Sequence, residues 1–172
     1  MQAPRALSWS RLVLRVLVVA NALYGLAILA MLIASLVAEG PFFAALGVKQ
    51  AEGADRMIRG GRFIMVLGLA AVPIGHLILA RLLAIVDTVR AGDPFVVQNA
   101  VRLQTIAWCV LGLEGLHLII GAIAATSASS VQPLDIDWNF SVTPWIAVLL
   151  LFVLARVFDH GARMRADLEG TV

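Results

Sequence analysis

The sequence predicts an all-α integral membrane protein, a four-helix bundle whose last helix continues as an amphipathic, cytoplasmic C-terminal extension. Of its 172 residues, 61% are hydrophobic and only 14% are charged, whereas soluble domains are about 45–50% apolar and roughly 25% charged. The charged residues gather in short intervals between long apolar runs. A chain of this length is expected to form a single domain, residues 1–172.

Four apolar segments are long enough to cross a bilayer, which requires about 20 helical residues. They should be helices, because hydrocarbon provides no partner for exposed backbone groups. The first run is much longer than a signal-peptide core of roughly 7–15 residues, so we expect it to be retained. Glu39-Gly40-Pro41 should end it, and Pro73 should kink the second span or weaken its hydrogen bonding. The predicted spans are residues 12–38, 63–86, 101–125 and 142–158, followed by a cytoplasmic tail at 159–172.

The distribution of basic residues predicts that both termini are cytoplasmic. In that orientation nine Lys or Arg side chains lie inside and four lie outside, which fits the positive-inside rule. The four outside residues all fall in the segment 40–62, where we expect a short interfacial helix around residues 49–59. These four are Lys49, Arg56, Arg59 and Arg62.

A short polar stretch, residues 92–103 (the hinge), separates the second and third spans. Gly92 is expected to end the preceding helix, because glycine tolerates left-handed dihedrals. Asp93 should then cap the next helix and Pro94 should occupy its first turn. Asn99 is an alternative cap if residues 95–98 form a separate turn.

The tail should continue the fourth helix and present a narrow apolar stripe, since four residues recur at spacings of four, three and four. They are Val157, Gly161, Met164 and Leu168. Opposite charges four residues apart should support the helix at Asp159/Arg163, Arg163/Asp167 and Arg165/Glu169. The stripe either rests on the lipid headgroups or the bundle, or docks a partner helix.

Three titratable residues are expected near mid-bilayer, where such groups are costly: His76, Glu114 and His117. One interpretation is a polar cluster that holds helices together. A second is a proton or substrate path. A third is a haem or metal site. The single cysteine, Cys109, cannot form a disulfide within one chain, and no phosphate-binding loop or hydrolase motif is present.

The hinge and the tail together resemble the DUF2975 family, a domain of unknown function found in four-span bacterial membrane proteins. The resemblance rests on Gly92-Asp93-Pro94-Phe95 with Asn99 and Arg102-Leu103, and on the tail with Gly161, Asp167-Leu168 and Thr171-Val172. It implies a bacterial inner-membrane protein, often encoded beside a small helix-turn-helix regulator. It implies no catalytic residues.

We therefore predict a non-enzymatic inner-membrane adaptor or sensor, without a cofactor or catalytic or metal site, that binds a small cytoplasmic helix-turn-helix regulator. A haem- or metal-binding redox protein and a small oligomeric transporter or proton path are the alternatives. The expected partners are the lipid bilayer, this regulator and further copies of the chain, but not nucleic acid directly. The predicted partner-binding residues are Asp93, Pro94, Phe95, Asn99, Arg102, Met164 and Leu168.

Overall fold

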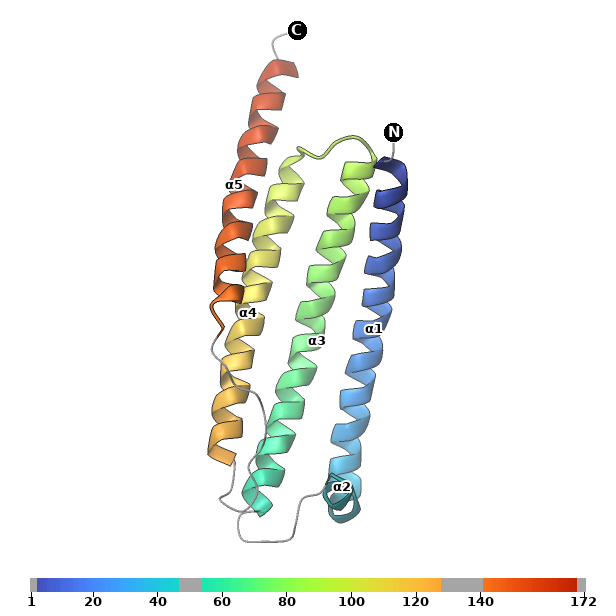
Figure 1. The fold of residues 1–172 in the computed structure, drawn as a ribbon, viewed down its shortest axis with the longest axis vertical. Helices are drawn as coiled ribbons and strands as arrows, with labels where there is room; N and C mark the ends of the chain where they lie inside the picture. The colour runs from blue at the N-terminus through green and yellow to red at the C-terminus, as the bar shows by residue number, and fades with distance from the viewer. Residues whose placement is uncertain (1–2, 47–53, 128–140, 170–172) are drawn as a thin grey trace. The chain divides into compact units, whose positions relative to one another are not determined.

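The computed structural model describes residues 3–46, 54–127 and 141–169, and within these ranges the only regular secondary structure is helical. The helices are α1 (Ala3–Val37), α2 (Glu39–Ala45), α3 (Ala54–Arg90), α4 (Val97–Ser127) and α5 (Thr143–Glu169) (Figure 1). All except α2 are long and apolar enough to cross a membrane. The predicted all-α, four-span fold is thus confirmed, and each long helix extends past its predicted span because polar flanking residues also stay helical.

The chain forms two compact units, each of which takes part of three long helices. The first unit contains Met1–Asn21, Ile74–Gly112 and Ser141–Val172, and so includes all of α5. At one end of this unit lie the start of α1, the connection between α3 and α4, and the C-terminal part of α5 (Figure 1). The second unit contains Ala22–Pro73 and Leu113–Phe140.

Helix α1 packs through a single narrow seam. Its less exposed positions recur at alternating spacings of three and four residues, while most other positions are open. This is the heptad spacing of a helix that contacts one neighbour. The seam positions are residues 11, 14, 18, 21, 25, 28, 32 and 35.

Small residues on this seam allow α1 and α3 to approach closely in the second unit. A Cβ atom added at Gly25 would lie 2.9 Å from a methyl carbon of Val72, and one at Gly68 would lie 3.3 Å from Ile28. Close backbone approach at small residues increases dispersion contacts, which drive helix association where lipid removes the hydrophobic effect. The glycines therefore carry this contact.

Arg62 closes one corner of the second unit. Its Nη2 lies 2.6 Å from a carboxylate oxygen of Glu39 and donates to the backbone carbonyl of Ser35 in the last turn of α1. The guanidinium carbon also lies 5.9 Å from the centre of the Phe43 ring. The positive charge of Arg62 is thus balanced locally by a carboxylate and by the negative end of a helix dipole.

The structure corrects the expected arrangement of segment 40–62. The short helix is α2, at Glu39–Ala45, and the part of residues 49–59 that the structure describes belongs to the first turns of α3. Glu39-Gly40-Pro41 ends α1 as predicted but also begins α2. Pro41 is tolerated there because it occupies a first turn, where a missing N–H costs little.

Pro73 does not interrupt α3, which continues from Ala54 to Arg90. The Pro73 ring has no N–H, so the backbone carbonyl of Leu69 loses its usual partner within the helix. The predicted weakening of hydrogen bonding therefore holds at one carbonyl, without a break in the helix.

Substitution of Gly25 by alanine should weaken the contact between α1 and α3 by about 1 kcal/mol, because the new methyl group overlaps Val72. Gly112→Ala is the matched control, since a Cβ at Gly112 meets nothing within 4 Å. Thermal unfolding of the purified protein in mild detergent measures both. Equal melting temperatures for the two variants would contradict the close contact at Gly25.

Candidate functional site

Helix α3 ends in a Schellman motif centred on Gly92, the predicted stop. Gly92 has φ +85°, the left-handed conformation that glycine adopts without a steric penalty. The N–H of Gly92 donates to the carbonyl of Val89, and the N–H of Asp93 donates to the carbonyl of Thr88, both at 3.1 Å. These are the two bonds that define the motif.

The start of α4 differs from the prediction. The helix begins at Val97, and residues 93–96 are irregular, so Pro94 does not occupy its first turn. Asp93 is not the predicted cap, because it stands four residues before the start of α4; its carboxylate instead forms an ion pair with the guanidinium of Arg165 on α5. The Asp93 side chain, which the neighbouring sequence predicts to cap α4, thus makes a tertiary contact instead.

Asn99 holds the hinge together from inside. Its side chain is fully buried, with 0% exposure. Its Nδ2 donates to the hydroxyl of Thr88 and to the carbonyl of Pro94, both at 2.8 Å, and its Oδ1 accepts from Arg102 at 2.7 Å. The amide thereby links the end of α3, the connection and the first turns of α4. Asn99 caps no second helix start, and its burial limits it to an indirect role in any partner surface.

Arg102 is held by the same network. Its Nη1 also lies 3.3 Å from the backbone carbonyl of Ala84 on α3. Because one nitrogen of the guanidinium bridges Asn99 and Ala84, the side chain has a fixed orientation across the α3–α4 junction. Arg102 is therefore a structural residue of the hinge as well as a predicted site residue.

Phe95 connects the hinge to α5. Its ring centre lies 5.4 Å from that of Phe158. A Cβ atom added at Gly161 would lie 2.9 Å from Cδ1 of Phe95, so the ring sits where a larger residue at 161 would be. Gly161 is thus needed for close approach of an aromatic ring to the helix.

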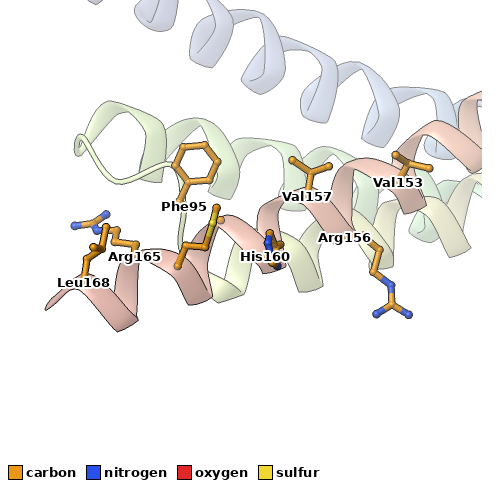
Figure 2. Close-up of a pocket in the computed structure, with 9 residues that line it drawn as sticks. Phe95, Val153, Arg156, Val157, His160, Arg165 and Leu168 are labelled. Atoms are coloured by element: carbon orange, nitrogen blue, oxygen red, sulfur yellow. The ribbon is translucent and has the colours of Figure 1, made fainter. Parts of the chain in front are cut away.

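An open apolar groove of about 720 Å³ lies where Phe95 meets α5 (Figure 2). Its lining includes all four residues of the predicted tail stripe, which shows that they share one face. Phe95 and the far turns of α5 remain substantially open, with Phe95 at 45% and Leu168 at 72% exposure. The lining residues are Phe95, Val153, Arg156, Val157, His160, Gly161, Met164, Arg165 and Leu168.

Two arginines and one histidine supply the polar side chains of the groove. Arg156, His160 and Arg165 line it, and none of its lining residues is acidic. Figure 2 shows the guanidinium of Arg156 extending outward from α5. Asp159 pairs with Arg163 at 3.0 Å, as predicted, and is not among the lining residues. Because Arg165 is paired with Asp93, the groove combines an apolar floor with the positive charge of Arg156 on its edge.

The two halves of the candidate site were predictable to different degrees. Met164, Leu168 and Phe95 form one surface in the first unit, while Pro94 contributes its carbonyl to the Asn99 network. Val153, Arg156 and His160 were not predicted as lining residues. Val153 lies one helical turn before Val157 and so continues the stripe, and His160 is next to Gly161. Both positions could have been found from the helical spacing of the sequence.

The predicted intramembrane residues occupy different environments. Glu114 is buried at 9% exposure on α4, whereas His76 on α3 and His117 on α4 are exposed. Across the described ranges, no group of three or more His, Cys, Asp or Glu side chains is arranged to hold a metal ion. The three interpretations of these residues stay predictions.

Comparison with known families adds one finding. A family model described as a protein of unknown function, DUF2975, matches residues 8–172. The chain belongs to the DUF2975 family. No curated protein and no solved structure gives a match. The family match confirms the resemblance seen in the hinge and the tail, and the DUF2975 description assigns no activity to the chain.

Replacement of Asn99 by alanine should lower the stability of this DUF2975 protein by about 1–2 kcal/mol, since Thr88, Pro94 and Arg102 lose their shared partner. Gln98→Ala is the control, because Gln98 is the exposed neighbouring amide. Thermal unfolding in detergent followed by circular dichroism measures the difference. A melting temperature for Asn99→Ala within error of that for Gln98→Ala would refute the role assigned to Asn99.

Proposed function

We propose that this chain is a non-enzymatic adaptor or sensor of the bacterial inner membrane that binds a small cytoplasmic helix-turn-helix regulator. The observation that carries the proposal is the open apolar groove between Phe95 and α5. In helix-in-groove recognition, an amphipathic helix places its apolar face in such a groove and anchors it at spacings of three and four residues. Val157, Met164 and Leu168 offer matching contacts.

The charge of the groove favours one face of the regulator. Arg156 lies on its edge without an ion pair among the described residues, so an apolar helix flanked by Asp or Glu is the complementary surface. The DNA-contacting surface of a regulator is basic, because it must bind phosphates. It is therefore repelled by the groove, and the regulator docks through a different, more acidic face.

The proposed orientation places both termini and the hinge in the cytoplasm. It is supported by the positive-inside count and by the clustering of basic residues in the first unit. In this orientation the C-terminal turns of α5 and the hinge are both accessible to a soluble regulator. The connection between α1 and α3 then faces the periplasm.

The adaptor proposal is tested by affinity purification of the tagged full-length chain from native membranes in mild detergent, followed by mass spectrometry. We expect a helix-turn-helix protein at near-stoichiometric level. The double variant Met164→Glu, Leu168→Glu should lose it, because buried carboxylates oppose an acidic partner in an apolar groove.

Ala166→Glu serves as the charge control, since Ala166 is exposed on the same tail but does not line the groove. It should retain the regulator. Recovery of the wild-type chain without such a regulator would reject the adaptor proposal. Full retention by the double variant would instead show that the regulator binds elsewhere.

The orientation is tested by single cysteines introduced in a Cys109→Ser background. Ala166→Cys and Gly40→Cys place thiols at exposed positions near the two ends of the chain's membrane spans. A membrane-impermeant maleimide applied to intact spheroplasts should label Gly40→Cys and spare Ala166→Cys until the membrane is opened. The reverse pattern would place the groove outside the cell and overturn the proposed orientation.

A further inference from the structure

A second, separate pocket lies at the junction of α3 and the start of α4. It has a volume of about 380 Å³ and is lined by Arg81, Val97, Gln98, Val101 and Arg102. Two of these five residues are arginines and none is acidic. All of them belong to the first unit, and none lines the groove at Phe95 and α5.

One of the two guanidinium groups is fixed in place before any ligand arrives. Nη1 of Arg102 bridges the side chain of Asn99 and the carbonyl of Ala84. An arginine carries five N–H donors, and these bonds use only one of its nitrogens. Pre-ordering of a side chain lowers the entropy lost on binding.

The other guanidinium is exposed and uncompensated. Among the described residues, Arg81 forms no ion pair and no side-chain hydrogen bond. The pocket also includes Val97 and Gln98, the first two residues of the 31-residue helix α4, where the helix dipole adds positive potential. Two guanidinium groups and this helix end therefore attract an anion to one place.

The position of the pocket along the helices indicates what kind of anion it meets. Arg81 directly follows residues 63–80, which contain no Asp, Glu, Lys or Arg, and Arg102 directly precedes a similar run at residues 103–113. Both arginines thus lie within a few residues of the ends of the predicted spans 63–86 and 101–125, close to the depth at which lipid headgroups lie. Val97 and Val101 add apolar walls beside the charges.

We propose that this pocket binds a phosphate group, carried either by the headgroup of an anionic phospholipid or by free phosphate. Guanidinium groups match the oxygens of phosphate with paired hydrogen bonds, and two of them can share one tetrahedral group. The site is separate from the groove proposed for the regulator, because the two pockets share no lining residue.

The test uses the purified full-length chain in mild detergent and three probes: phosphatidylglycerol, phosphatidylcholine and inorganic phosphate. Native mass spectrometry measures retained lipid, and thermal stabilisation measures phosphate binding. The wild type should retain phosphatidylglycerol in preference to phosphatidylcholine. Arg81→Gln should bind the anionic probe about tenfold more weakly, the effect expected for a lost charge-assisted pair.

Two further variants make the result specific. Arg90→Gln removes an exposed arginine from the same helix but outside the pocket, and should bind as the wild type does. Arg81→Lys keeps the positive charge but lacks the paired N–H donors of a guanidinium group, so it should bind with intermediate affinity. Melting temperatures without added probe check that each variant is folded.

The probes distinguish the two sources of phosphate. Stabilisation of the wild type but not of Arg81→Gln by inorganic phosphate identifies free phosphate as a ligand, whereas a response to phosphatidylglycerol alone identifies a lipid headgroup. Equal binding of every probe by the wild type and Arg81→Gln would overturn the proposal. An equal loss in Arg90→Gln would also overturn it, because net charge rather than the pocket would then explain binding.

Discussion

The buried amide of Asn99 is the interaction on which the candidate site depends. With three hydrogen bonds it fixes the end of α3, the carbonyl of Pro94 and the guanidinium of Arg102 relative to one another. Thr88 extends the network by donating to the carbonyl of Ile85 at 2.8 Å. Because the Asn99 amide is buried and its partners are half-buried, leaving the amide without a partner would be costly, so the network favours a single conformation of the connection.

That fixed connection positions the two residues that reach α5. Phe95 packs against Phe158 and over Gly161, and Asp93 pairs with Arg165. The ring contact and the ion pair hold α5 at different turns of the helix. Together they define how close α5 lies to the connection and how it is rotated about its own axis. The groove is therefore a product of the hinge as much as of the tail, although the two are far apart in sequence.

The charges at this end of the first unit are distributed unevenly. Asp87 pairs with Arg11, Asp93 with Arg165 and Asp159 with Arg163. These carboxylates are thereby paired, and so is Arg165 of the groove. The groove and the pocket of Arg81 and Arg102 have no acidic lining residue. Among the described residues, arginines without an ion pair thus line two separate pockets at this end, with Arg156 at the groove and Arg81 at the smaller pocket.

The sequence was sufficient where local chemistry decides the structure. The spans follow from the length of the apolar runs, and the tail stripe follows from helical spacing. The end of α3 follows from Gly92, because glycine tolerates the left-handed conformation found there. It failed where a distant residue competes with a local one. The neighbouring sequence predicts that Asp93 caps the next helix, but its carboxylate pairs with Arg165 instead. Arg62 departs from the predicted distribution of basic residues, and its partner Glu39 is 23 residues away in the sequence. No local pattern reports such pairings, since they depend on which helix faces come together.

The single seam of α1 also has a consequence for biosynthesis. The seam carries Arg11 and Ser35, whose partners Asp87 and Arg62 both belong to α3. A ribosome adds about 5–20 residues per second, so α1 waits for seconds in the insertion machinery or the bilayer before α3 is made. During that interval Arg11 and the backbone carbonyl of Ser35 lack the partners that α3 later provides. Helix α1 must therefore tolerate lipid or a translocon on every side before it can join the bundle.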